Sequence, residues 1–180
     1  SVEEYFKALG DATRAVPDSR LIIASRSTSV RGALLKEARA RGLKGVPYED
    51  AGDAPLPGLF AKADIFICSH STVVYEALLS GLPVVIASFA PAEKMMTDFH
   101  FGPFEKAGAL KIAHTPEELR EMVRELAADP EVRARMSAAG ESFMREQFSF
   151  DGHAAERIAD KIRVWAATKG ESVNVATYPQ

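Results

Sequence analysis

The sequence predicts an α/β fold, in which a single domain holds a doubly wound, Rossmann-like parallel sheet. Short continuous apolar runs such as "RLIIAS", "DIFIC" and "PVVIAS" are typical of strands that are buried on both faces. Segments with helical patterns separate these runs, and strands that alternate with helices favour right-handed crossovers and a parallel sheet. The chain shows no internal repeat and no low-complexity tract.

The helices and strands are predicted from the spacing of apolar residues, from helix-capping residues, and from the glycines and prolines that interrupt regular structure. Helices are predicted at residues 3–15, 29–41, 58–62, 72–80, 116–128, 130–147 and about 151–167. Strands are predicted at residues 20–25, 43–48, 64–68, 83–88 and 108–113. Gly42 is expected to end the second helix, and Thr115-Pro116-Glu117-Glu118 reads as a capping box. A long connection is expected between the last two strands.

Residues 1–168 are expected to form the domain, and residues 169–180 a flexible tail. Domains of this class normally begin with a strand, whereas this chain opens on a helix. The expectation is therefore a fragment whose earlier part, including a first strand, is absent.

Composition narrows the class of protein. The 180 residues are 47% hydrophobic and 26% charged, which is the balance of a soluble globular domain. The net charge of -3 argues against a nucleic-acid surface. No apolar run reaches the ~20 residues of a membrane span. The single cysteine, Cys68, excludes an internal disulfide and gives no metal pattern, so a cytoplasmic setting is expected.

Ligands of doubly wound sheets bind beyond the carboxyl ends of the strands. The predicted strand ends direct attention to residues 25–28, 46–48, 69–72 and 87–92.

Ser69-His70-Ser71-Thr72 joins a predicted strand to a predicted helix. Ser71 is the expected N-cap. The first N–H groups of a helix lack partners within it and its dipole is positive there, so a phosphate can bind. The hydroxyls of Ser71 and Thr72 would add donors, although Ser and Thr also serve as simple caps.

Glu76 follows Thr72 by one helical turn and lies among apolar neighbours. A carboxylate accepts hydrogen bonds from vicinal hydroxyls, so Glu76 is a candidate for the ribose of a nucleotide whose phosphates bind the join. The alternative is an exposed helical glutamate.

The stretch Glu76-Ala77-Leu78-Leu79-Ser80-Gly81-Leu82-Pro83-Val84-Val85 resembles the signature of the donor-binding, C-terminal domain of GT-B glycosyltransferases. "ADIFICSHST" resembles the corresponding join of the peptidoglycan N-acetylglucosaminyltransferase and of surface-polysaccharide transferases. "EKAGALKI", with the helical pattern after it, resembles the end of the same domain.

The resemblance implies a role for each matching position. Glu76 would bind the ribose hydroxyls, and Ser71 and Thr72 the diphosphate. The implied remaining contacts are His70 and Ser69 at the phosphates or the donor sugar, Val46 to Tyr48 at the base, and Phe89 to Asp98, including Lys94, at the sugar pocket.

Three departures from the family pattern limit the resemblance. Cys68 replaces the second glutamate of many retaining members, and "FAPAEKMMTDFHF" lacks the glutamine pair that reads the sugar. Ser25-Arg26-Ser27 replaces a His-Pro pair. Arg26 is a candidate phosphate contact, with an exposed loop arginine as the alternative.

Several residues receive a structural interpretation. His100, His114 and His153 are read as structural or surface histidines without catalytic partners, and Cys68 as an inert core thiol. Core packing is favoured over a cleft lining for Met95, Met96, Phe99, Phe101 and Phe104.

The resemblance implies a donor domain that binds a nucleotide-diphosphate sugar, UDP first and CDP second, for transfer to a cell-surface polysaccharide or glycolipid. The catalytic base would lie in a partnering N-terminal domain, and no metal or other cofactor is expected. A lipid-linked acceptor would place the protein at the inner face of the membrane. The alternatives are a CDP-glycerol-type polyol-phosphate transferase, a non-hydrolysing nucleotide-sugar 2-epimerase and a non-catalytic binding module.

Overall fold

The computed structural model describes residues 2–24, 36–37, 39–52, 54–149 and 151–169. Two compact units are present, residues 1–144 and residues 145–180, and each is described by itself. Arg26, most of the helix expected at 29–41 and the tail beyond residue 169 lie outside the described residues.

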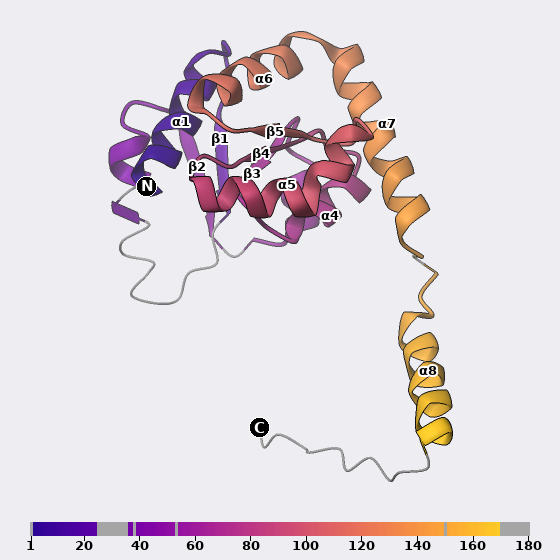
Figure 1. The fold of residues 1–180 in the computed structure, drawn as a ribbon. Helices are drawn as coiled ribbons and strands as arrows, with labels where there is room; N and C mark the ends of the chain where they lie inside the picture. Colours follow the sequence, from indigo (N-terminus) through magenta and orange to yellow (C-terminus); the bar gives the residue numbers. More distant parts are fainter. Residues whose placement is uncertain (1, 25–35, 38, 53, 150, 170–180) are drawn as a thin grey trace. The chain divides into compact units, whose positions relative to one another are not determined.

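Helices and strands alternate through most of the first unit (Figure 1). The helices are α1 (Val2–Arg14), α3 (Leu56–Phe60), α4 (Val73–Leu79), α5 (Pro91–Lys106), α6 (Pro116–Ala128), α7 (Pro130–Gln147) and α8 (Ala154–Lys169). The strands are β1 (Leu21–Ala24), β2 (Tyr48–Gly52), β3 (Phe66–Cys68), β4 (Val84–Ala87) and β5 (Lys111–Ala113). Residues 36–37 and 39–42 are also helical.

All strand pairs are parallel, which confirms the predicted fold class. β1 pairs with β2, and a second sheet has the order β3-β4-β5. β4 lies in the middle of the second sheet, and all four of its residues are buried. Helix α6 covers one side of β4 and β5, and α5 lies on the other side (Figure 1).

β1 and β3 each have one edge without a strand partner among the described residues. Their apolar residues, including Ile22 and Ile67, are only half-buried, although the runs are typical of strands buried on both faces. In the strand order 3-2-1-4-5-6 of doubly wound sheets, one strand separates these two edges. The observed orders β2-β1 and β3-β4-β5 match that scheme, and no strand of the described residues takes the separating position.

The prediction of a strand at 43–48 was wrong, because β2 begins at Tyr48. Leu43 and Val46 are apolar because they are buried in a turn, in which Gly45 has a φ of 75°. β2 itself, Tyr48–Gly52, is polar and mostly exposed, so an apolar run did not mark it.

The long connection expected after the fourth strand also proved wrong, because it contains the 16-residue helix α5. Pro91 lies at its start, and the Glu93 carboxylate accepts a hydrogen bond from the Ala90 N–H at 3.4 Å. The helix continues through Gly102 and Pro103.

The predicted start of α6 is confirmed. The Thr115 hydroxyl accepts a hydrogen bond from the Glu118 N–H at 3.1 Å. The Glu118 carboxylate accepts a hydrogen bond from the His114 N–H at 2.6 Å. In the usual capping box this bond comes from the N–H of the N-cap residue, here Thr115, so the donor is one residue earlier.

A close crossing between α1 and residues 39–42 explains Gly42. A Cβ at Gly42 would lie 2.6 Å from the Phe6 Cβ and 2.8 Å from the Lys7 nitrogen. Because Gly42 has no positive φ, it serves this close approach rather than the left-handed helix end that the sequence suggested.

In the second unit, two ion pairs join the first turn of α8 to the residues just before it. Arg157 pairs with Asp151 at 2.6 Å, and His153 pairs with Glu156 at 2.8 Å. Over the described part of the chain, no helix combines the length and the apolar character needed to cross a bilayer.

We predict that Gly42→Ala lowers the free energy of unfolding by about 1–3 kcal/mol, because the new methyl group overlaps backbone atoms that cannot move away easily. Chemical denaturation measures the change. Gly58→Ala is the matched control, since a Cβ there meets nothing within 4 Å. Equal stability of the two variants would contradict the close crossing.

Candidate functional site

The candidate site lies at the carboxyl ends of β3 and β4. β3 ends at Cys68, and the join Ser69-His70-Ser71-Thr72 leads into α4. β4 ends at Ala87, and the chain enters α5 four residues later at Pro91. The join and the first half of α5 are therefore the segments that ligands of such folds approach.

Thr72, not Ser71, is the N-cap of α4, and its side chain makes no capping bond. The Ser71 hydroxyl instead accepts from the Val73 N–H at 3.3 Å. The N–H groups of Val74 and Tyr75 donate to the carbonyls of Ser71 and Thr72 at 3.3 and 3.1 Å. The first N–H groups of this helix lack partners within it, as expected, but they find acceptors in Ser71 and Thr72 just before it. Anion binding here therefore depends on the side chains of the join.

Glu76 is exposed on α4, and its carboxylate has no partner among the described residues. Its exposure agrees with the alternative of an exposed helical glutamate, and Thr72, Leu79 and Ser80 on the same helix are exposed as well. The carboxylate is thus available to a ligand without first breaking a protein contact.

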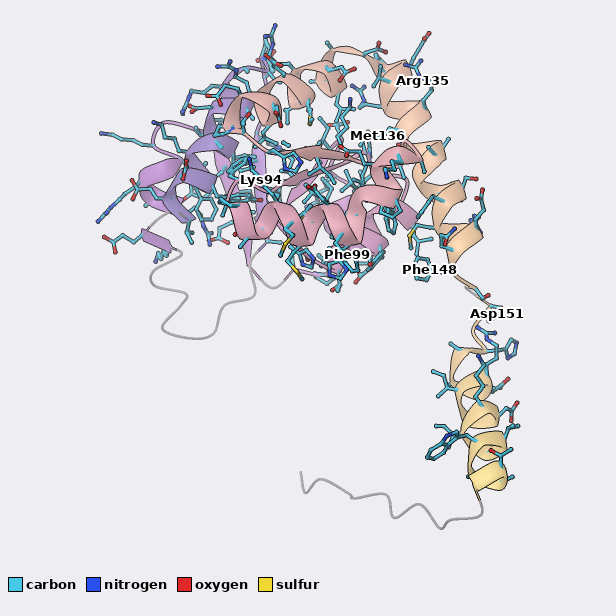
Figure 2. The ribbon with its side chains drawn as sticks, viewed as in Figure 1. Lys94, Phe99, Arg135, Met136, Phe148 and Asp151 are labelled. Atoms are coloured by element: carbon cyan, nitrogen blue, oxygen red, sulfur yellow. The ribbon has the colours of Figure 1, made fainter. Side chains whose placement is uncertain are left out.

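Ser69, His70 and Thr72 are exposed beside Glu76 in sequence, and Ser71 is half-buried. Lys94 is half-buried on α5, where Figure 2 shows it near the start of the helix. Val46 and Tyr48 precede or begin β2, and Tyr48 pairs with Leu21, the first residue of β1. These two residues therefore lie at the amino end of the strand pair. They were expected at the carboxyl end of a strand, and that expectation rested on the predicted strand at 43–48, which was wrong.

Tyr5 of α1 approaches the same strand ends, a placement that the sequence did not indicate. Its ring lies 6.3 Å from the ring of Phe89, which follows β4. Burial raises the pKa of the Tyr5 phenol far above its ordinary value, and the nearby Cys68 and Glu93 raise it further. Tyr5 thus stays protonated.

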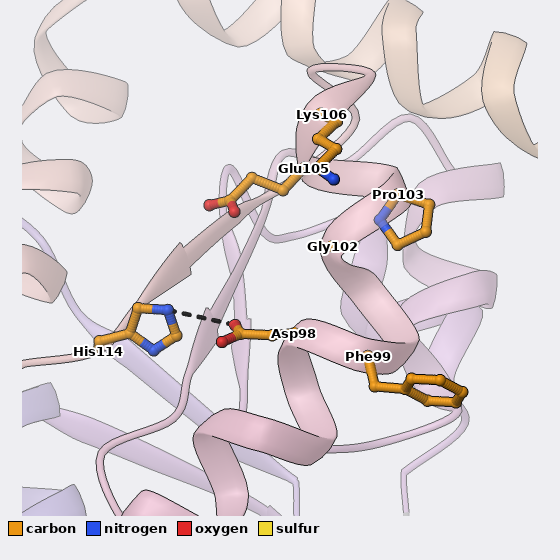
Figure 3. Close-up of a pocket in the computed structure, with 7 residues that line it drawn as sticks. All are labelled: Asp98, Phe99, Gly102, Pro103, Glu105, Lys106 and His114. Carbon is orange, nitrogen blue, oxygen red and sulfur yellow. Dashed lines mark ion pairs between the residues drawn. The ribbon is translucent and has the colours of Figure 1, made fainter.

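A hydrogen-bond network ties α5 to the ends of β4 and β5. Ser88 and Thr97 are both buried, and their hydroxyl oxygens are 3.0 Å apart. The His114 Nε2 lies 3.3 Å from an Asp98 carboxylate oxygen (Figure 3). The Glu105 carboxylate accepts from the Ile112 N–H of β5 at 3.0 Å. These contacts fix the position of α5 over the sheet.

A cavity of about 530 Å³ borders α5 on this side. Figure 3 shows the side chains that line it, with Asp98 directed toward His114. Its lining is Asp98, Phe99, Gly102, Pro103, Glu105, Lys106 and His114. Asp98 contacts His114, and Glu105 accepts from the Ile112 N–H of β5. These polar side chains hold α5 in place, so the cavity is explained by packing and needs no ligand.

The outer face of α5 is apolar and exposed. Phe99 is 79% exposed, Met95 69% and Met96 46%, so core packing was the wrong interpretation for these three residues. Figure 2 shows Phe99 at the edge of α5. Phe101 and Phe104 are buried, as packing predicts.

His100 is exposed, in agreement with its interpretation as a surface residue, and its ring lies 5.2 Å from the ring of His70, a contact that the sequence did not indicate. His114 and His153 likewise have acidic partners. Because the sequence suggested a connection rather than a helix at α5, no periodic pattern was available to bring His100 toward the join.

No group of three or more His, Cys, Asp or Glu side chains able to hold a metal ion occurs in the described ranges. Metal-independent binding stays a prediction.

The fold defines the class of protein only as a Rossmann-like α/β domain with parallel sheets, a fold shared with part of a solved glycosyltransferase. The solved structure of WaaG, a glycosyltransferase involved in lipopolysaccharide biosynthesis, matches 89% of this chain with a TM-score of 0.54 and 16% sequence identity. The match covers 44% of the WaaG chain, so this chain spans less than half of that length. No family model and no curated protein sequence matches the chain.

We predict that Thr97→Val lowers the free energy of unfolding by roughly 1–3 kcal/mol, because it leaves the buried Ser88 hydroxyl without its partner. The double variant Ser88→Ala/Thr97→Val removes both polar groups and should recover much of the loss. Chemical denaturation of the three proteins tests this. A double variant less stable than Thr97→Val would contradict the pairing.

Burial raises the pKa of the Cys68 thiol from 9.0 to about 12. The thiolate is the reactive form, so the folded protein should be alkylated by iodoacetamide at pH 8 far more slowly than the denatured chain. The same shift makes folding less favourable as pH rises from about 9 toward 12, because the unfolded chain loses this proton first. Equal alkylation rates with and without denaturant would contradict the assignment.

Proposed function

We propose that this chain binds a nucleoside diphosphate sugar at the mouth of α4, as the donor-binding part of a GT-B glycosyltransferase. The observation that carries the proposal is the exposed, unpartnered carboxylate of Glu76, one helical turn beyond the join Ser69-His70-Ser71-Thr72 at the carboxyl end of β3. The fold shared with WaaG supports it.

In the proposed complex, Glu76 accepts hydrogen bonds from the ribose hydroxyls. The hydroxyls of Ser69, Ser71 and Thr72 lie toward the diphosphate, together with His70. Lys94 at the start of α5 supplies a positive charge on the sugar side, and Arg26 after β1 is proposed as a second cation. UDP is the first candidate nucleotide and CDP the second.

The chemistry asked of these residues is stabilisation of the leaving group. The departing nucleoside diphosphate gains negative charge, and hydroxyl, imidazole and cationic donors placed around it lower the energy of that state. The proposed general base lies outside these residues, in an N-terminal domain that also holds the acceptor. A polysaccharide or lipid-linked acceptor at the inner face of the membrane is the proposed substrate, so the isolated chain is expected to bind donor but not to turn it over.

The proposal separates experimentally from its alternatives. Preference for CDP over UDP and GDP would indicate the polyol-phosphate transferase. Turnover of a UDP-sugar to its 2-epimer by the chain would indicate the epimerase. A folded chain that binds none of the three nucleotides would be a non-catalytic module.

We predict that Glu76→Ala weakens UDP binding by about 1–3 kcal/mol, the usual loss for a hydrogen bond to a charged group. Isothermal titration calorimetry measures the affinity. Glu121→Ala, which removes an exposed carboxylate from α6, is the matched control and should bind UDP as the unmodified chain does.

2′-Deoxy-UDP makes the test specific to the ribose. It should bind the unmodified chain more weakly than UDP does, whereas Glu76→Ala should bind both nucleotides alike. If Glu76→Ala discriminates between the two nucleotides as strongly as the unmodified chain, the ribose role of Glu76 is wrong.

A further inference from the structure

We propose that His100 of α5 acts together with His70 of the join, and that the two imidazoles bind one phosphate group of the nucleotide diphosphate. This inference rests on the proposed function and adds to it a binding residue from a second structural element. It also assigns the third turn of α5 to the phosphate side of the site, beyond Lys94 on the first turn.

The two rings come from segments far apart in sequence. His70 follows β3 directly, and His100 lies on the third turn of α5. Their centroids are 5.2 Å apart with an interplanar angle of 65°, and both residues are exposed. Since N–H···O bonds span about 2.7–3.2 Å, one phosphate group bound beside the two rings is within reach of both.

Aromatic neighbours fix the orientation of the pair. The His70 ring lies 5.4 Å from the ring of Phe101, which is buried, at an interplanar angle of 63°. The His100 ring lies 5.2 Å from Phe99 at an angle of 81°. Rings held by edge-to-face packing lose less conformational freedom when a ligand binds, so their hydrogen bonds contribute more to affinity.

The ring nitrogens of this pair make no hydrogen bond within the part of the chain that the structure describes. The other two histidines differ, because His114 contacts Asp98 and His153 contacts Glu156. A neutral imidazole has one N–H donor, so the pair offers two donors that no protein acceptor occupies.

The backbone N–H groups at the start of α4 are already hydrogen-bonded, so a phosphate there needs side-chain donors. The N–H groups of Val73, Val74 and Tyr75 already have local acceptors, and α4 is only seven residues long. A diphosphate at this mouth therefore depends on side-chain donors. The imidazoles of His70 and His100 are the pair that the structure holds side by side there.

The first test measures UDP affinity by calorimetry. His100→Ala should weaken UDP binding roughly tenfold, the change expected for one hydrogen bond to a charged acceptor. His153→Ala is the matched control and should leave the affinity unchanged. In the double variant His70→Ala/His100→Ala, the loss should be smaller than the product of the two single losses, because both residues bind the same group.

A second test needs no substitution. Inorganic pyrophosphate is titrated into the unmodified chain while the imidazole resonances are followed by NMR. The resonances of His70 and His100 should shift together and saturate, whereas those of His153 should not move. Equal shifts at all three histidines, or none at His70 and His100, would overturn the proposal.

The two levels of the proposal fail in different ways. If His100→Ala binds UDP as tightly as the unmodified chain while Glu76→Ala is weakened, the imidazole pair is wrong and the nucleotide site stands. If the unmodified chain, shown to be folded by circular dichroism, binds none of UDP, CDP and GDP, the nucleotide site is wrong and the imidazole pair with it.

Discussion

The burial of β4 is the constraint on which the rest of the molecule depends. Val84, Val85, Ile86 and Ala87 are almost completely excluded from solvent, with β3 and β5 hydrogen-bonded on either side. Burying apolar surface of this kind is the dominant favourable term in folding. Because the strands are parallel, their carboxyl ends emerge at one edge, and the join after β3, the start of α5 and His114 reach that edge together.

The short helix α4 returns the chain to this sheet through a tight turn. Gly81 has a φ of 72°, which an L side chain rarely adopts, and the Leu82 N–H donates to the Ala77 carbonyl at 3.1 Å. The glycine within the stretch that resembles the GT-B signature is thus required by backbone geometry. Glu76 lies in the same helix, but the turn does not depend on its side chain. Its carboxylate therefore remains available to a ligand.

The sequence predicted best where apolar patterning and caps agreed. The bounds of α6 and α7 matched the expected ranges, because proline and a capping residue mark both starts. The bounds of β2 were not predicted, because it is a polar strand beside an apolar turn. The helix α5 was not predicted, because its outer face is apolar and the sequence therefore lacks the alternation of polar and apolar residues that marks a helix. The nearness of His100 to His70 and of Tyr5 to Cys68 depends on tertiary packing, so no local pattern could have predicted either.

The edges of β1 and β3 that have no strand partner among the described residues have a practical consequence. Edge strands with open backbone donors and acceptors act as templates for any extended chain, and apolar side chains along them strengthen such pairing. At high protein concentration these edges would pair with strands of other molecules, and the protein would aggregate. This tendency is separate from nucleotide binding. Preparation of this chain therefore favours dilute, low-temperature handling, with light scattering as the guide to sample quality.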